Sequence, residues 1–244
     1  MPDLEKLSLK KLSQEIKSRE NKPQAAGLQR FFKTGPGQYG AGDRFLGLKV
    51  PLQRLLARKY RDLPLSDIEK LLRGEFHEFR LIGLLILVEQ YEKAADRGKK
   101  KELVDFYLAH TAHINNWDLV DLSVYKILGD FLVSDRKALA VLKKLAGSQN
   151  MWERRMAIVA TYAFLKNGEA EKTLVIAKQL LADKHDLIHK AVGWMLREMG
   201  KRVSQKTLTD FLDQNRQRLP RTTLRYAIER LSPRERADYL AKIV

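Results

Sequence analysis

Residues 151–200 read MWERRMAIVATYAFLKNGEAEKTLVIAKQLLADKHDLIHKAVGWMLREMG. Apolar residues recur at intervals of three and four through this stretch, which is the spacing of amphipathic helices. A break at Asn167-Gly168 separates a first helix from a second, and another helix is expected to begin near residue 186. The stretch therefore predicts a unit made of one helix, a short turn and a second helix.

The same unit recurs along the chain. Helical units are expected to begin near residues 76, 117, 151, 186 and 219, at intervals of 33 to 41 residues. Further breaks at Ser134-Asp135, Gly200 to Ser204 and Ser232-Pro233 divide these units. A two-helix repeat of this length is typical of HEAT-like α-solenoids. We therefore predict an all-α fold and a single curved domain over residues 1–244, with one basic concave face shared by the first helices at 117–133, 151–166, 186–200 and 219–231.

Composition narrows the class of protein further. The chain has 46 Lys and Arg against 30 Asp and Glu, a formal net charge of +16, and 44% hydrophobic residues. That balance supports a folded core and excludes wholesale disorder. The longest apolar run, residues 81–88, is far shorter than the ~20 residues that cross a bilayer, and the charged start has no signal-peptide core. We expect a soluble, cytoplasmic protein whose partner is a polyanion, nucleic acid first and an anionic membrane surface second.

Local motifs mark helix starts and one long loop. Ser66 to Glu69 and Ser232 to Glu235 have the capping-box spacing, and a first helical segment is expected at about 3–33, followed by another at about 51–60. Between them, GPGQYGAGDRFLG at 35–47 contains a formal G-x-G-x-x-G. A dinucleotide loop must follow a strand, whereas this one follows a helical stretch and contains Pro36. A structured loop at the rim of the solenoid is the better interpretation.

No cofactor or metal is expected. Cysteine is absent, which removes thiolate ligands and cysteine nucleophiles. The pairs His110/His113 and His185/His189 each share a helix face, but neither has the H-E-x-x-H arrangement of a zinc site. Surface or capping histidines are the simpler interpretation.

The segment NWDLVDL at 116–122 is the most informative for chemistry. Trp117 and Asp121 are four residues apart, so an aromatic ring and a carboxylate project from one helix face. Asp118 points elsewhere and suits the helix start, where negative charge complements the helix dipole. Core packing of Trp117 and a buried ion pair between Asp121 and an arginine remain open alternatives.

Three later helices carry cations beside aromatic residues. The first has Arg155 with Tyr162 and Lys166, and the last has Arg221 and Arg225. Between them lies a stripe at helical spacing made of Lys190, Trp194, Arg197 and Lys201. Each stripe alone is typical of a solvated face, but together they suit binding to a phosphate backbone and to bases or sugars.

These motifs together resemble the AlkD-type DNA alkylation repair family, HEAT-like DNA glycosylases that excise positively charged alkylated purines. The resemblance covers about residues 28–240 and rests on NWDLVDL, WERRMAIV, HKAVGWMLRE, PRTTLRYAIER and the early glycine-rich segment. It implies that Asp121 is the catalytic carboxylate, that Trp117 and Trp194 are active-site tryptophans, and that Arg155 binds phosphate. Three positions depart from the family pattern: Phe31 replaces a Tyr, Lys49 a Gln and Ala163 a Lys.

The resemblance implies a monomeric, monofunctional DNA glycosylase that needs no cofactor and acts in base excision repair on alkylated purines in duplex DNA, without a membrane partner. Its catalytic residues would be Asp121, Trp117 and Trp194. Its DNA contacts would come from Arg155, Lys190, Arg197, Arg221, Arg225, Phe31 and Lys49. Two other functions remain open: a non-catalytic HEAT-like protein that binds branched or distorted DNA, and a protein-interaction scaffold.

Overall fold

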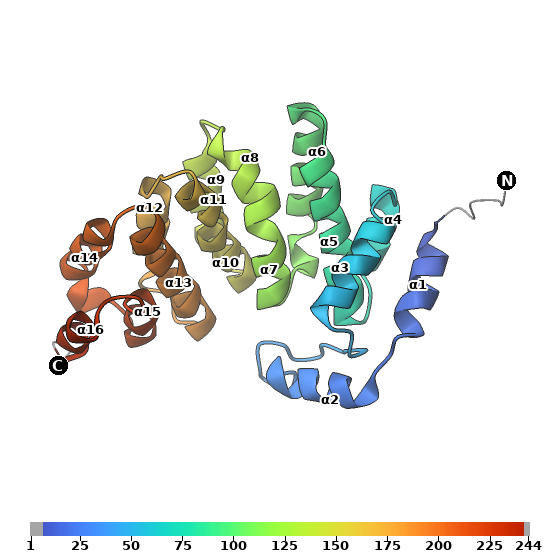
Figure 1. The fold of residues 1–244 in the computed structure, drawn as a ribbon, viewed down its shortest axis with the longest axis horizontal. Helices are drawn as coiled ribbons and strands as arrows, with labels where there is room; N and C mark the ends of the chain where they lie inside the picture. The colour runs from blue at the N-terminus through green and yellow to red at the C-terminus, as the bar shows by residue number, and fades with distance from the viewer. Residues whose placement is uncertain (1–6, 242–244) are drawn as a thin grey trace. The chain divides into compact units, whose positions relative to one another are not determined.

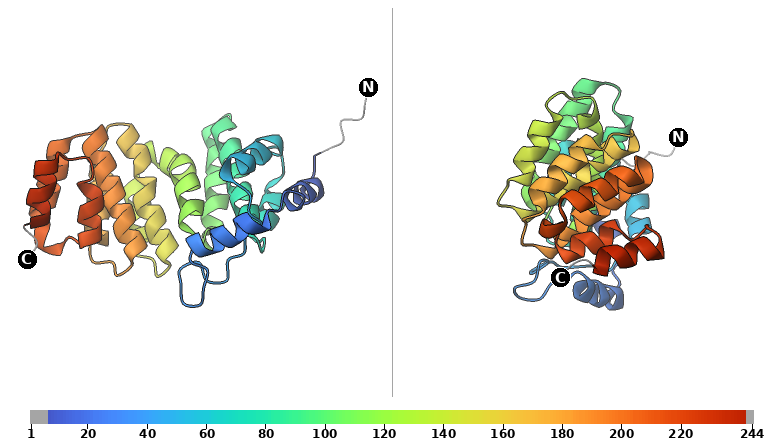
Figure 2. Two further views of the ribbon diagram at one scale, coloured as in Figure 1. Left: turned by 60° about the horizontal axis from the view of Figure 1, so that its bottom comes forward. Right: turned by 90° about the vertical axis from the view of Figure 1, so that its left-hand side faces the viewer.

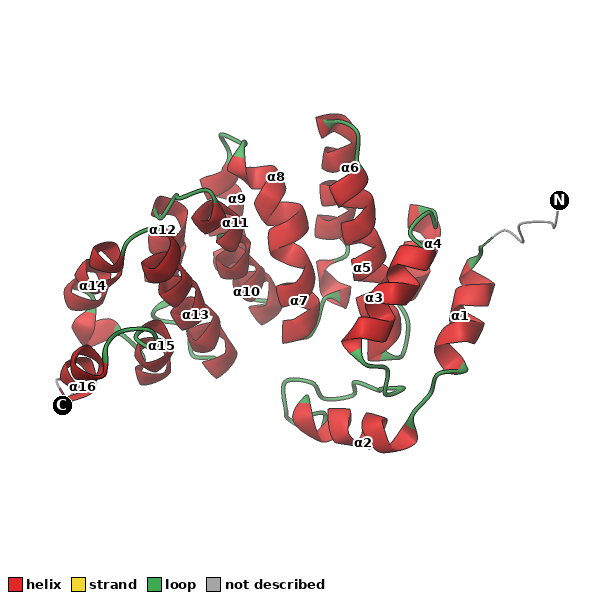
Figure 3. Ribbon diagram, viewed as in Figure 1, coloured by secondary structure: helices red, strands yellow, loops and turns green. Residues whose placement is uncertain are grey.

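The computed structural model describes residues 7–241 of the chain, which forms two compact units, Met1–Ser123 and Val124–Val244. Helices make up both units (Figure 1). No strand occurs among residues 7–241; Arg44 and Phe76 form an isolated bridge (Figure 3). The predicted all-α class is therefore confirmed, while the single domain over 1–244 stays a prediction.

The first unit is centred on one long buried helix. Helix α5 packs against α3, α4 and α6, and its side chains from Leu81 to Val88 are all buried. Such a helix needs apolar residues on all sides, which the run at 81–88 supplies. The helices of this unit are α1 Leu9–Lys17, α2 Lys22–Phe31, α3 Val50–Lys59, α4 Leu65–Leu72, α5 His77–Lys93, α6 Arg97–Ala109 and α7 Trp117–Val124, with a 3-10 turn at Thr111–His113 before α7.

The second unit stacks helical pairs in order. Helix α13 packs against α10 and α15 on the side of the first helices, while α9 packs against α12 among the second helices. Equivalent helices thus line up in two rows, as in an α-solenoid. The elements are a π-helical turn at Tyr125–Gly129, α8 Asp130–Val133, α9 Ala138–Ala146, α10 Met151–Ala160, α11 Tyr162–Lys166, α12 Glu171–Leu180, α13 Asp186–Arg202, α14 Gln205–Gln214, a 3-10 turn at Arg216–Arg218, α15 Arg221–Ala227 and α16 Pro233–Ala241.

The repeat predicted from the sequence is confirmed in both units. Helices α5, α7, α10, α13 and α15 begin at residues 77, 117, 151, 186 and 221, against expected starts near 76, 117, 151, 186 and 219. Helix boundaries also fall at the predicted internal breaks, with α13 ending at Arg202 within the segment from Gly200 to Ser204. Ser232 and Glu235 form the reciprocal capping box at the start of α16, since each backbone N–H donates to the other side chain, at 2.9 and 3.3 Å.

Three local predictions were wrong. The segment expected at about 3–33 is two helices within its described part, because Asn21 caps α2 and Pro23 stands in its first turn. Ser66 lies inside the first turn of α4, whose cap position is Pro64, so it forms no capping box. The helix expected over 219–231 spans only Arg221–Ala227.

Glycine allows the closest approach between first helices. A Cβ on Gly193 in α13 would lie 2.5 Å from the Thr223 carbonyl oxygen and 2.5 Å from the Tyr226 Cβ in α15. The backbones of α13 and α15 are therefore packed at a distance that only glycine permits at this position.

None of the helices within residues 7–241 combines the length and apolar character that a bilayer crossing requires.

Candidate active site and nucleic-acid interface

Trp117 is held at the first position of α7 by a buried cap and a stack of rings. Asn116 is fully buried, and its Oδ1 accepts the Trp117 backbone N–H at 2.8 Å. The indole ring stacks on Phe32 with centroids 5.2 Å apart and planes 17° from parallel. Phe31 meets the same indole edge-on at 6.0 Å. These contacts fix the indole in place, and because the ring remains partly exposed it is still accessible.

The stack continues away from Trp117 into the first unit. Phe32 stacks on Phe45 at 5.0 Å, and Phe45 stacks on His77 at 4.6 Å. Phe32 and Phe45 belong to a buried cluster with Ala25 against which Trp117 packs. Core packing, the first alternative for Trp117, is therefore part of its role but does not bury the ring completely.

A buried network of charges lies beneath this stack. His77, the first residue of α5, is 2% exposed. Its Nδ1 lies 3.0 Å from Asp43 Oδ2, and its Nε2 lies 2.8 Å from Asp118 Oδ2 in α7. Asp43 also accepts hydrogen bonds from the Arg80 guanidinium and from Asn116 Nδ2. Two carboxylates and two cationic side chains thus join the glycine-rich loop, α5 and the start of α7.

The charges in this network stabilise one another. Burial disfavours the imidazolium form of His77, but the negative charges of Asp118 and Asp43 and their hydrogen bonds outweigh it and raise the pKa of His77 to about 9. Burial likewise opposes the charge on Asp43, yet the hydrogen bond from His77 and the Arg80 guanidinium hold its pKa below the usual value. His77 and Asp43 are therefore both charged at neutral pH.

The glycine-rich loop between α2 and α3 is held by a third buried carboxylate, Glu78. Glu78 is 0% exposed and accepts the backbone N–H groups of Leu46, Gly47 and Leu48 at 2.9, 2.7 and 3.2 Å. Gly47 has φ +89°, and a Cβ there would lie 2.2 Å from the Asn21 carbonyl oxygen. The loop extends from the end of α2 (Figure 2). It is the structured loop that the sequence predicts, and it follows a helix, unlike a dinucleotide loop.

Asp121 lies one turn after Trp117 on α7 and is half-buried. Its negative charge affects the buried Tyr107 hydroxyl in the first unit. Burial raises the pKa of the Tyr107 hydroxyl well above its ordinary value, and the negative charge of Asp121 raises it further. The Tyr107 hydroxyl lies 3.0 Å from Ser123 Oγ, which is also on α7. This carboxylate therefore occupies a region of reduced water access, where its field is stronger than at an open surface.

Two predicted DNA contacts also belong to the first unit. Phe31, at the end of α2, is 64% exposed although it touches Trp117. Lys49 is exposed immediately before α3. The structure thus brings Phe31 and Trp117 together.

Trp194 lies on α13 in the second unit, beside Tyr162, whose ring is contacted by the guanidinium of Arg202. Its ring centroid is 6.4 Å from that of Tyr162. The Arg202 guanidinium lies 4.9 Å from the centre of the Tyr162 ring and donates to the Tyr162 hydroxyl at 2.5 Å. Tyr125 meets Tyr162 edge-on at 5.2 Å. Aromatic residues from three elements, the turn at Tyr125–Gly129, α11 and α13, therefore form a row within this unit.

Two predicted phosphate-binding arginines make contacts inside the protein. Arg155 on α10 is only 5% exposed, and its Nη1 donates to the Leu187 carbonyl at 2.6 Å. Arg197 on α13 forms an ion pair with Glu229. Both side chains therefore hold neighbouring repeats together, and phosphate binding by either stays a prediction.

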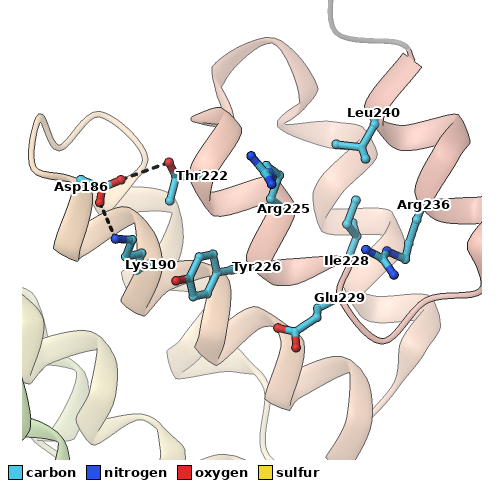
Figure 4. A pocket seen from close by; sticks show the side chains of 9 residues that line it. All are labelled: Asp186, Lys190, Thr222, Arg225, Tyr226, Ile228, Glu229, Arg236 and Leu240. Atoms are coloured by element: carbon cyan, nitrogen blue, oxygen red, sulfur yellow. Dashed lines mark hydrogen bonds and ion pairs between the residues drawn. The ribbon is translucent and has the colours of Figure 1, made fainter.

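Lys190 and Arg225 line one pocket of about 490 Å³ in the second unit (Figure 4). Asp186 Oδ2 pairs with Lys190 Nζ at 2.8 Å, and the Thr222 hydroxyl donates to Asp186 Oδ1 at 3.1 Å. The hydrogen bond from Lys190 is the main cause that holds the pKa of Asp186 below its usual value. Arg221 and Arg225, on α15, are exposed and make no ion pair with another described residue.

Comparison with known proteins identifies the family of this chain. The chain matches the family of DNA alkylation repair enzymes over residues 12–231. It belongs to that family. A solved structure named as a predicted DNA alkylation repair enzyme from Enterococcus faecalis has the same fold, with a TM-score of 0.70 at 18% identity, over 88% of this chain and 97% of that one. No curated protein matched the chain. The resemblance seen in the sequence motifs is confirmed.

The sequence analysis does not single out His77, which forms two buried hydrogen bonds to carboxylates in this DNA alkylation repair protein. His77 is separated from Asp43 by 34 residues and from Asp118 by 41. The other four histidines form two spaced pairs, whereas His77 has no histidine neighbour in the sequence. One signal was available, since a histidine four residues before the longest apolar run, 81–88, is a candidate for burial with a partner.

Proposed function

We propose that this DNA alkylation repair protein is a monofunctional DNA glycosylase. It hydrolyses the N-glycosidic bond of cationic 3- and 7-alkylpurines in duplex DNA and begins base excision repair. One observation carries the proposal: in a chain of this family, α7 presents a half-buried carboxylate, Asp121, one turn from an indole ring, Trp117, that is fixed by stacking and still partly exposed.

The chemistry suits a carboxylate acting without a general acid. A purine alkylated at nitrogen 3 or 7 already carries positive charge, so it leaves as a neutral base. The sugar develops oxocarbenium character as the bond breaks, and a fixed negative charge stabilises it. A carboxylate oxygen can also hold the attacking water. Asp121 is assigned both roles, and Lys side chains need form no Schiff base.

The tryptophans are assigned to the cationic nucleotide. The face of an indole ring attracts positive charge, by about 0.5–2 kcal/mol depending on solvent exposure. Trp117 has its ring plane set by Phe32, so it is ready to contact the nucleotide without reordering. Trp194 is assigned the same chemistry in the second unit. DNA phosphates are assigned to the cations Arg155, Lys190, Arg197, Arg221 and Arg225, with further backbone contacts from Phe31 and Lys49.

The decisive experiment measures base release from methylated duplex DNA. Wild-type protein is expected to release free 3-methyladenine and 7-methylguanine. Asp121→Asn is expected to keep its fold and its affinity for undamaged duplex but to lose about 10²- to 10³-fold in single-turnover rate, as expected when ~3–4 kcal/mol of electrostatic stabilisation is removed.

Asp105→Asn is the matched control, because Asp105 is an exposed carboxylate on α6 that pairs with Lys101 at the helix surface. Its rate is expected to equal that of the wild type. A rate for Asp121→Asn within threefold of wild type would remove Asp121 from its catalytic role. DNA binding by the wild type without any base release would contradict the glycosylase and favour a non-catalytic DNA-binding protein.

A further inference from the structure

We propose that His77 is a positioning residue of this enzyme: by bridging Asp43 and Asp118 as an imidazolium, it fixes the start of α7 and with it the orientation of Trp117 and Asp121. The activity part of this inference rests on the proposed glycosylase function. The positioning part does not, because it has a spectroscopic readout of its own.

With both acids ionised, the geometry requires a protonated ring. Each ring nitrogen of His77 faces a carboxylate oxygen, at 3.0 Å for Asp43 and 2.8 Å for Asp118. Ionised carboxylates only accept hydrogen bonds, whereas a neutral imidazole donates from one nitrogen alone. Both bonds can form together only when both nitrogens carry hydrogen. A neutral ring would leave one buried carboxylate facing a lone pair, which is strongly unfavourable away from water.

The groups around the ring support the imidazolium. Asp43 comes from the glycine-rich loop, Asp118 from α7, and Arg80, which pairs with Asp43, from α5 itself. Glu78, a buried acid on α5 next to His77, faces the loop backbone at residues 46–48 and not the imidazole ring. Phe45 covers one side of the ring by stacking at 4.6 Å. The raised pKa of His77, about 9, agrees with this environment.

Two routes connect this bridge to the catalytic helix. Asp118 is the next residue after Trp117 and lies three residues before Asp121, so a tie at Asp118 fixes the first turn of α7 directly. The second route runs through rings, from His77 to Phe45 and Phe32 and on to the indole of Trp117. Through these two routes, His77 acts on both the backbone position and the ring orientation of Trp117.

The test compares His77→Gln with the wild type. Glutamine cannot offer a donor to both carboxylates from the two ring-nitrogen positions. Single-turnover release of 3-methyladenine is expected to fall about 10- to 100-fold, the usual cost of misplacing a reacting group or losing its orienting partner. The dissociation constant for undamaged duplex is expected to stay within about twofold, because no phosphate contact is altered.

The indole N–H signals of Trp117, Trp152 and Trp194 in a ¹H–¹⁵N spectrum give the independent readout. The Trp117 signal is expected to move in His77→Gln while the other two stay in place. The matched control is Thr161→Val, which removes a fully buried hydroxyl that donates to the Ile158 carbonyl in the second unit. It is expected to lower stability without moving the Trp117 signal or slowing base release.

A titration of the wild type keeps the test decisive if His77→Gln fails to fold. The Trp117 signal is expected to shift together with the His77 ring signals as pH rises through about 9. A Trp117 signal that ignores both the substitution and the titration would overturn the inference. Wild-type protein that releases no base would refute the glycosylase function, and the Trp117 signal would still decide whether His77 positions α7.

Discussion

Asp118 and Asp121 stand three residues apart on α7 and have different surroundings. Asp118 is buried, and its two oxygens contact the His77 ring and the Leu119 N–H. Asp121 is half-buried, with its charge acting on Tyr107. A carboxylate already engaged by a buried cation has little capacity left for a reacting sugar. Asp121, three residues further along α7, is the acid to which the proposed mechanism assigns the reacting sugar.

The indole of Trp117 gives a prediction at the same scale. Trp117→Phe is expected to slow release of 7-methylguanine modestly, by about 3- to 30-fold, because phenyl keeps the stack on Phe32 but attracts cations more weakly than indole. Trp117→Ala is expected to cost more, because it removes the ring from the stack altogether. Single-turnover rates for both variants make the measurement.

Trp152→Phe is the control for Trp117, since Trp152 is a buried tryptophan on α10 of the second unit. It is expected to leave the rate unchanged. Release of uracil is also measured, because a neutral base would leave as an anion and requires a proton donor. Equal rates on uracil and 7-methylguanine would refute a mechanism that depends on charge already present in the lesion.

The sequence reveals the part of the candidate site that lies within one helical turn. Trp117 and Asp121 share α7, so their spacing alone predicts that they share a face. The supporting contacts could not be predicted in this way. Asp43, His77 and Asp118 lie on three different elements, and local periodicity carries no information on which buried acid meets which buried base. The burial of Arg155 was hidden for the same reason, since its partner Leu187 is 32 residues away.

At the scale of elements, helix starts were predictable and interruptions within helices were not. Starts depend on local signals such as caps and breaks, and five first helices begin within two residues of the expected positions. The π-helical turn at Tyr125–Gly129 has no such signal. It lies where Gly129 approaches α10, since a Cβ there would be 2.5 Å from the Ala160 carbonyl oxygen. This close approach joins residues 31 positions apart, so no local sequence signal could indicate it.

The close packing of α13 against α15 predicts that enlarging Gly193 destabilises the protein. Gly193→Ala is expected to lower the free energy of unfolding by about 1–3 kcal/mol, because the added methyl group would overlap the Thr223 carbonyl and force the two helices apart. Urea unfolding followed by circular dichroism measures the change. Gly27→Ala is the matched control, since Gly27 lies inside α2 with nothing within 4 Å of the added atom.

Helix propensity predicts the opposite sign for that control, a gain of up to about 1 kcal/mol. A loss of stability in Gly27→Ala as large as in Gly193→Ala would show that packing between α13 and α15 is not the cause.

For the whole molecule, the net charge of +16 is the property most relevant to a polyanionic partner. The predicted DNA-binding cations of the second unit differ in how ready they are to bind phosphate. Arg155 and Arg197 have partners inside the protein, and Lys190 pairs with Asp186. Arg221 and Arg225 are exposed on α15 and need break no ion pair with a described residue before they contact DNA.

This difference predicts how salt acts on DNA binding. Each phosphate neutralised contributes about −0.9 to the slope of log K against log salt, so five contacts give a slope of about −4 to −5 for undamaged duplex. The double variant Arg221→Gln/Arg225→Gln is expected to make the slope shallower by about 1.8. The control Lys99→Gln/Lys101→Gln removes the same charge from α6, where each lysine pairs with an acid on its own helix. It is expected to change the slope by much less, because long-range charge is screened at moderate salt whereas a released counterion is counted at each contact. Equal changes in slope from the two double variants would mean that the overall charge binds the duplex and that α15 has no particular part in binding. A wild-type slope shallower than about −1 would favour a protein-interaction scaffold over a DNA-binding enzyme.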